Sequence, residues 1–280
     1  MRLLLDYSAQ QTSGIGAWSR DTEHMEKAFL FGGKPAAGGV TAAMLIRSGW
    51  TGVDDIFAGP DNFFEALAPT ENGVVKADPT QLVEKLGERY EIIRTNIKKW
   101  TVGSPIQAPL DALAGFFKQR SFTADDVRKV VVRIASDEAN TVSNRDMPDI
   151  CMEHMVAVML LDKTATFRSA HDKARMKDPA VLRQRAKVEV VADPRIDARR
   201  PRREAIVEVA LADGTQMSEW IRDVRGTAEN PMPREEVVAK ARDLIAPVLG
   251  NATCATLINK VLALESLKDI RELRPVLQRS

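Results

Sequence analysis

The pattern of apolar and polar positions divides the chain into helical ends and a mixed middle part. Up to about residue 90, apolar residues recur at helical spacing, interrupted by glycine pairs at 32–33 and 38–39. Between residues 91 and 225, short β-branched runs alternate with helical stretches. Helical spacing returns over 235–248 and 252–264. This order predicts an α+β fold, in which an α+β module is inserted into a mainly helical domain.

Individual elements can be predicted within the middle part. Apolar helices are expected at 105–118 and 149–162, and strands at 91–100, 127–135, 187–192, 204–211 and 215–224. In the first strand Lys98 and Lys99 would point to opposite faces, because side chains alternate along a strand. Asp213-Gly214, between the last two strands, is a strong signal for a hairpin turn.

Composition narrows the class of protein. The 280 residues include 44% apolar residues, enough for a core, and the net charge of +1 argues against a dedicated nucleic-acid binder. Two widely separated cysteines indicate a reducing compartment and argue against a four-thiolate cluster or zinc site within one chain, and the three histidines show no metal-binding spacing. Without a signal-peptide pattern or a membrane-spanning apolar run, the sequence predicts a cytoplasmic protein that does not bind membranes.

Residues 23–63 combine many glycines with candidate anion-binding side chains. Small residues at this density permit close helix packing, which is their more frequent use, or leave room for a small anion. His24 lies three residues before Lys27, so both would share one face of a helix. Lys34 precedes Pro35 at a helix start, where an anion is favoured, although helix initiation alone also explains it.

Five segments, in order along the chain, resemble the MmgE/PrpD family, which includes 2-methylcitrate dehydratase and cis-aconitate decarboxylase. EKAFLFGGKPAAGGVTAAMLIRSGWTG resembles the family's lysine- and glycine-rich segment, and NIKKWTVGSPIQAPLDAL resembles its lysine loop. NRDMPDICMEHMVAVMLLD resembles its apolar lid helix. The stretch from KVEVVAD through VEVALADGT resembles its closing hairpin, and NPMPREEVVAKARDL its last helical piece.

The resemblance implies a large helical domain and a smaller α+β lid, with the active site between them. It divides this chain into a remnant of the helical domain at 1–90, the lid at 91–225 and returning helices at 226–280. Family members are typically homodimers that need no metal, iron–sulfur cluster or nucleotide. Because relatives are longer, we expect the chain to lack the first half of the helical domain, with its catalytic aspartate and histidine-containing motif. It would then form a homodimer or join a chain that supplies this half.

The implied activity is that of a lyase, which removes water or carbon dioxide from a small di- or tricarboxylate. By the resemblance, Lys27 and Lys98 occupy the two active-site lysine positions, where compact ammonium groups would bind carboxylates. Weaker candidates for substrate binding are His24, Lys34, Asn144 and Arg145, the last because arginine can clamp a carboxylate. The resemblance places Val142, or Thr141 or Ser143 if the loop shifts, at the position of a tyrosine that belongs to the decarboxylase site.

Alternative interpretations stay open for the candidate residues and for the function of the whole chain. Most lysines and loop arginines are solvated surface groups. Cys151 is expected in the core, and His154 is expected in the core or at an interface with its hydrogen bonds satisfied. His171 is expected on the surface, and the arginine-rich run at 195–203 could attract an anionic partner but is most simply a solvated turn. The whole chain could be a non-catalytic truncated paralogue or partner subunit. An isomerase or epimerase of a small dicarboxylate is a further alternative, because proton removal and return use similar groups.

Overall fold

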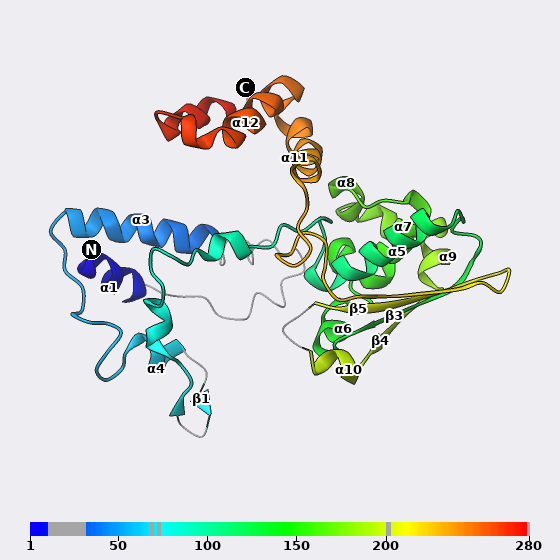
Figure 1. Ribbon diagram of the computed structural model, residues 1–280, viewed down its shortest axis with the longest axis horizontal. Helices are drawn as coiled ribbons and strands as arrows, with labels where there is room; N and C mark the ends of the chain where they lie inside the picture. The colour runs from blue at the N-terminus through cyan, green and yellow to red at the C-terminus, as the bar shows by residue number, and fades with distance from the viewer. Residues whose placement is uncertain (11–31, 68–69, 72–73, 200–202, 279–280) are drawn as a thin grey trace. The chain divides into compact units, whose positions relative to one another are not determined.

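Figure 1 shows the computed structural model, which describes residues 1–10, 32–67, 70–71, 74–199 and 203–278. The chain forms two compact units, Met1–Tyr90 and Glu91–Ser280. The roles assigned above to 1–90, 91–225 and 226–280, as helical remnant, lid and returning helices, stay predictions.

The first unit consists of short helices joined by turns. Its elements are α1 (Arg2–Gln10), α3 (Lys34–Arg47), α4 (Phe63–Leu67) and a small hairpin of β1 (Thr70–Glu71) and β2 (Val74–Val75). Helix α3 is followed by Gly49 with a φ of +95°, the left-handed residue that the sequence pattern predicts after a helix. Within α3 only Ala42 is buried, whereas Val40 and Met44 are 64% and 65% exposed.

The second unit is built on a four-stranded mixed sheet with the order β4-β3-β5-β6. The strands are β3 (Val127–Ile134), β4 (Val188–Ala192), β5 (Ala205–Leu211) and β6 (Gln216–Ile221). Strand β3 is parallel to β4, with Val130 opposite Val188, and antiparallel to β5, with Val130 opposite Val209. Strands β5 and β6 are antiparallel. Four of the five predicted strands, and the α+β class, are therefore confirmed.

The turn between β5 and β6 forms where Asp213-Gly214 predicts it. Gly214 has a φ of +90°, which a glycine adopts without strain. The Asp213 carboxylate accepts hydrogen bonds from the N–H of Thr215, at 2.9 Å, and from the guanidinium of Arg120, at 2.6 Å. These contacts fix the turn and with it the register of the hairpin.

Helices α5 (Gln107–Gln119) and α7 (Met152–Asp162) build the core of the second unit together with the sheet (Figure 1). Met152 to Leu160 of α7 are all buried, so this helix is enclosed on every side. Val207 and Val209 of β5 face this core, whereas Ile206 points to the opposite face, where it joins Ile196 and Trp220. The other helices are α6 (Ser136–Val142), α8 (Phe167–Ala170), α9 (Pro179–Arg185), α10 (Pro194–Asp197), α11 (Arg234–Leu249) and α12 (Asn251–Leu262).

The strand predicted at 91–100 is wrong. Glu91–Arg94 forms a 3-10 turn, and the residues that follow have no regular structure. Ile92 and Ile93 are 79% and 80% exposed, so no neighbouring strand or helix buries them. β-Branched residues favour a strand only where a sheet covers one of their faces. The alternation that would separate Lys98 from Lys99 therefore does not apply.

The core of the second unit contains one titratable group in an unusual state. His154 of α7 is fully buried, as expected, but the expectation that its hydrogen bonds are satisfied is wrong: neither of its ring nitrogens has a hydrogen-bond partner in the described part of the chain. Burial, with the nearby charges of Arg185 and Arg175, lowers the pKa of His154 to about 4. The folded protein therefore holds this imidazole neutral over a pH range where the unfolded chain protonates it.

We predict that His154 makes the protein less stable in mild acid. Below about pH 6.5 His154 is protonated in the unfolded chain but stays neutral in the folded protein until about pH 4, so the free energy of unfolding should fall by about 3 kcal/mol over this range. Urea unfolding at several pH values measures this loss. His154→Leu should show a shallower fall than the wild-type chain, and equal slopes for the two would contradict the prediction.

Candidate functional site

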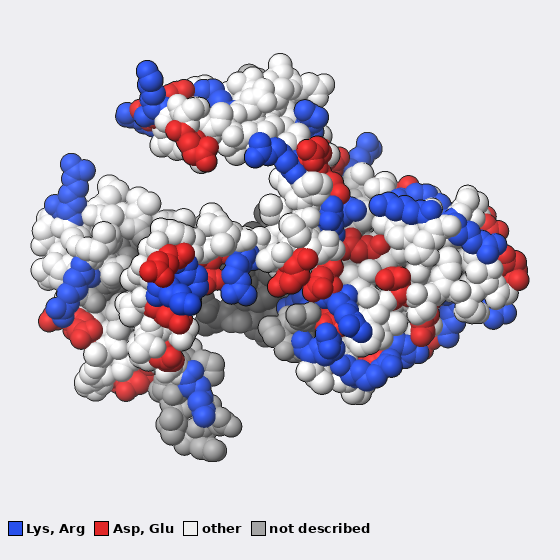
Figure 2. All heavy atoms as spheres, viewed as in Figure 1, with Lys and Arg blue, Asp and Glu red and all other residues white. Residues whose placement is uncertain are grey.

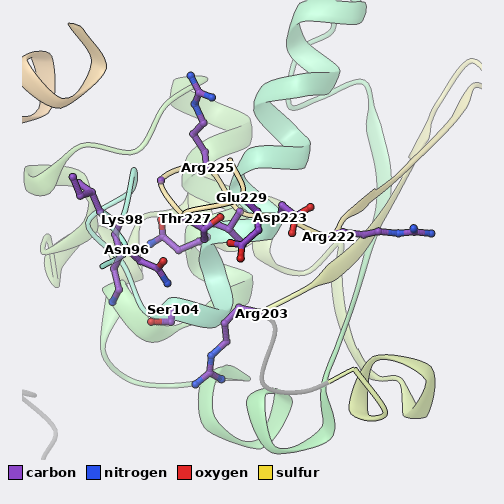
Figure 3. Close-up of a pocket in the computed structure, with 13 residues that line it drawn as sticks. Asn96, Lys98, Ser104, Arg203, Arg222, Asp223, Arg225, Thr227 and Glu229 are labelled. Carbon is purple, nitrogen blue, oxygen red and sulfur yellow. The ribbon is translucent and has the colours of Figure 1, made fainter. Parts of the chain in front are cut away.

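A cavity of about 330 Å³ adjoins the segment that holds Lys98 (Figure 3). Its lining consists of residues 96–98, 104, 107, 203, 222–227 and 229. These residues include four cationic side chains, Lys98, Arg203, Arg222 and Arg225, and two carboxylates, Asp223 and Glu229. The volume is at the small end of the range for ligand pockets, and the charges favour a compact anionic molecule.

The amide of Gln107, at the start of α5, holds the Lys98 segment in place. This side chain is 3% exposed; its Oε1 accepts from the N–H of Trp100 at 3.1 Å, and its Nε2 donates to the Trp100 carbonyl at 2.8 Å. The Lys98 ammonium donates to the carbonyl of Val102, at 3.3 Å. A buried amide with both ends paired fixes the backbone on which Lys98 stands.

The backbone of Gly226 anchors the same segment from the other side of the cavity. The N–H of Ile97 donates to the Gly226 carbonyl at 2.8 Å. Gly226 has a φ of +96°, and a Cβ atom there would overlap the carbonyl oxygen of Ile97. Nearby, the Asp111 carboxylate accepts from the N–H of Arg225 at 2.8 Å and from the Trp100 indole at 2.9 Å, while burial raises its pKa. Glycine is therefore required where the two walls meet.

Two of the three arginines at the cavity are engaged by carboxylates. Arg203 forms an ion pair with Glu138 of α6, which is 1% exposed. Arg225 pairs with Glu236 at 2.8 Å. Arg222 stacks on the Trp220 ring, 4.5 Å from its centroid, and forms no ion pair within the described ranges. In Figure 3 the three guanidinium groups point in different directions, so they do not converge on one atom of a ligand.

The cavity wall also contains a hydroxyl group that lacks a partner. Oγ1 of Thr227 is buried and makes no hydrogen bond in the described part of the structure. Leaving such a group unpaired costs about 1–3 kcal/mol, which a water molecule or a polar ligand offsets. Asp223 and Glu229, labelled in Figure 3, line the same cavity and add proton acceptors to it.

Asn144 and Arg145 do not line this cavity. Asn144 lies at another cavity, of about 510 Å³, where its main-chain N–H donates to buried Glu153 at 2.8 Å and its Oδ1 accepts from Arg185 at 3.3 Å. Asn144 has a φ of +50°, a conformation that asparagine tolerates better than most residues. Arg145 lines neither cavity. The structure therefore brings together Lys98 and three arginines, but not these two residues.

The remaining candidates are Lys27, His24 and Lys34. Lys27 and His24 fall outside the described residues. Lys34 is the exposed first residue of α3, in the first unit. The site roles of all three residues stay predictions.

Several weaker expectations can be compared with the structure. Cys151 is buried, and burial raises the pKa of its thiol, while His171 is exposed; both agree with the sequence interpretation. The solvated turn expected at 195–203 is wrong for two of its arginines. Arg199 pairs with fully buried Glu204 at 2.8 Å, and Arg203 pairs with Glu138. Two carboxylates inside the protein need these cations nearby.

Sequence reasoning missed Gln107, Arg222 and Gly226. Arg222 and Gly226 belong to a polar stretch between strand β6 and Asn230-Pro231, which marks a surface turn. That signal predicts a loop. It does not predict that the loop contacts residue 97, which lies more than one hundred positions earlier in the sequence. No local pattern indicates the partner of Gln107.

No set of three or more metal-ligating side chains gathers in the described part of the chain. Likewise, none of the described helices is both long and apolar enough to cross a bilayer.

Comparison with known families identifies the class of protein. The sequence profile of the MmgE/PrpD C-terminal domain matches residues 100–265, more than half of the chain. The chain therefore belongs to the MmgE/PrpD family. No curated protein sequence matches it. The matched range contains all cavity residues from Ser104 to Glu229, and it begins two residues after Lys98.

We predict that Gly226→Ala disrupts the Lys98 segment. The added methyl group overlaps the Ile97 carbonyl and the backbone has a positive φ, so unfolding should become easier by about 2–4 kcal/mol. Chemical denaturation measures this change.

Gly115→Ala is the matched control, because Gly115 lies inside α5 with no atom within 4 Å of an added Cβ. This control should stabilise the protein by about 0.5–1 kcal/mol. Equal effects of the two substitutions would show that the contact between residues 97 and 226 is not tight.

Proposed function

We propose that this chain provides the carboxylate-binding lid of a lyase, which removes water or carbon dioxide from a small di- or tricarboxylate. The observation that supports this proposal is the cavity at Lys98, in a chain of the MmgE/PrpD family. Its four cations, its buried hydroxyl and its volume of about 330 Å³ suit a compact polyanion.

Positive charge at this cavity serves both binding and chemistry. Lys98 offers a compact ammonium and Arg222 an exposed guanidinium for substrate carboxylates. Arg203 and Arg225 are held by Glu138 and Glu236 and so act as fixed cations beside them. Removing a proton next to a carboxylate builds up negative charge on the substrate, and fixed cations lower the barrier to this step.

Elimination also needs a base that takes the proton. In dehydration the electron pair of the broken C–H bond forms the double bond, the C–O bond breaks, and an acid gives the leaving hydroxide the proton that makes it water. In decarboxylation the bond between carbon and the carboxylate breaks instead, carbon dioxide leaves, and the electron pair that stays on the substrate takes up a proton. Asp223 and Glu229 are carboxylates at the cavity wall that can accept a proton. His24 is a further candidate, because a histidine can shuttle a proton. The family resemblance gives Lys27 a carboxylate-binding role and implies that the general base belongs to the missing half of the helical domain.

The exposed apolar surface favours a partner chain. Val40 and Met44 lie one turn apart on α3, and both are mostly exposed. Contiguous apolar side chains of this kind mark an interface or a tendency to aggregate. We infer that the chain forms a homodimer or binds a chain that completes the helical domain.

We predict that the purified chain sediments as an oligomer, because burying these side chains in an interface is favourable. Analytical ultracentrifugation measures its mass. Val40→Glu with Met44→Lys should increase the monomer fraction, whereas the same charges at exposed positions on α12, Asn251→Glu with Thr256→Lys, should not. A stable wild-type monomer would contradict the prediction.

We predict that citrate binds at the Lys98 cavity. Lys98→Met and Arg222→Met should each weaken binding about tenfold, the loss expected for one charge-assisted hydrogen bond at a partly exposed site. Arg242→Met removes an exposed arginine on α11 that does not line the cavity and should leave affinity unchanged. Calorimetric titration measures all four proteins.

The carboxylate-binding role would be overturned if citrate does not bind, or if the wild type and the three variants bind citrate with equal affinity. Proton NMR of citrate, isocitrate and methylcitrate in deuterated water then separates the possible reactions. An unsaturated product supports the lyase, and exchange of the substrate C–H without elimination supports the isomerase. A chain that binds citrate but produces neither change is the non-catalytic alternative.

A further inference from the structure

A separate cavity of about 290 Å³ begins where the first one ends along the chain. Residues 96–98 line the cavity described above, and residues 99–101 line this one. Its remaining walls come from the turn at 164–167, from Met232 and from one face of α11. Residues 236, 239, 240 and 243 form that face, with the spacing of successive helical turns.

Two ammonium groups line this cavity, and neither forms an ion pair with a carboxylate in the described structure, although Arg225 and, more weakly, Lys99 lower the pKa of Glu236. Lys240 of α11 is half-buried, and its Nζ donates to the main-chain carbonyl of Lys98. Burial lowers the pKa of Lys240. The Nζ of Lys99 lies 4.7 Å from the centroid of the Trp100 ring. An ammonium that is partly removed from water is destabilised unless an anion or several hydrogen bonds replace the lost hydration.

A hydroxyl at the same cavity also lacks a partner. Oγ1 of Thr101 is buried and makes no hydrogen bond in the described part of the chain. A hydroxyl can donate to an anion, so it adds a third binding group to the two lysines.

Neither of the two carboxylates that line this cavity forms an ion pair with Lys99 or Lys240 in the described structure. Glu236 is engaged by Arg225, which donates to it at 2.8 Å and 3.2 Å. Asp243 is exposed and lies on α11 three positions after Lys240. Two ammonium groups therefore face one solvated carboxylate and one that is already neutralised.

We propose that this cavity binds a compact dicarboxylate anion, held by Lys240 and Lys99 with the Thr101 hydroxyl as a further donor. Two cations match two negative charges. The rings of Trp100 and Phe167 offer apolar contact to a carbon skeleton, which inorganic phosphate does not have. Because Lys240 also bonds the Lys98 carbonyl, an anion bound here competes for the group that helps to hold the Lys98 segment.

Malonate is the probe, and calorimetric titration of the full chain is the measurement. The wild-type protein should bind malonate more tightly than phosphate, and Lys240→Met should weaken malonate binding at least about tenfold. Lys268→Met removes an exposed lysine outside the cavity and should bind as the wild type does. Ala239→Phe should also abolish binding, because it fills the cavity while keeping both lysines.

The Lys98→Met variant distinguishes the two cavities. Any malonate bound at the first cavity should be lost from this variant, but one malonate per chain should still bind, with an affinity within about twofold of the Lys240-dependent site of the wild type, because the Lys98 side chain lines only the first cavity. The proposal is overturned if malonate does not bind, if phosphate binds as tightly, or if Lys240→Met and Ala239→Phe bind like the wild type. Loss of binding in Lys98→Met alone would assign malonate to the first cavity. These titrations measure binding alone, so their result does not depend on whether the protein has the proposed lyase activity.

Discussion

A single backbone contact, between Gly226 and Ile97, determines where the candidate site forms. The Ile97 N–H bonds the Gly226 carbonyl at 2.8 Å, in a position that leaves no room for a Cβ atom. This contact joins the segment before α5 to the segment that leaves the β5–β6 hairpin. The two segments bring a lysine and two arginines to one cavity, although neither segment has regular secondary structure there.

Buried carboxylates organise the arginines of the second unit. Glu138 and Glu204 are each 1% exposed, and each pairs with an arginine from the run at 195–203. Breaking one such pair would leave an uncompensated charge inside the protein, which is far more costly than losing a surface ion pair. The arginine-rich run is thus bound to the helices and strands behind it. Arg203 in particular forms part of the cavity wall because Glu138 holds it there.

The segment from Asn96 to Thr101 is shared by two cavities with different charge arrangements. The first cavity combines four cations with two carboxylates, and it lies almost entirely within the range that defines the family. The second places Lys99 and Lys240 beside aromatic rings. Gln107, Gly226 and Lys240 all bond the main chain of this one segment. A change in any of these contacts therefore acts on both cavities through the backbone.

The sequence alone determined the order of elements and the family, because both depend on local spacing. The apolar run of α7 is buried along its length, and Asp213-Gly214 forms the predicted turn. Local patterns failed at residues 91–100, where β-branched side chains suggested a strand but no sheet covers them. Likewise, nothing near Gln107, Arg203 or Gly226 in the chain indicates what each contacts. Only the tertiary structure decided these pairings, because they join positions far apart in sequence through buried hydrogen bonds, ion pairs and close backbone packing.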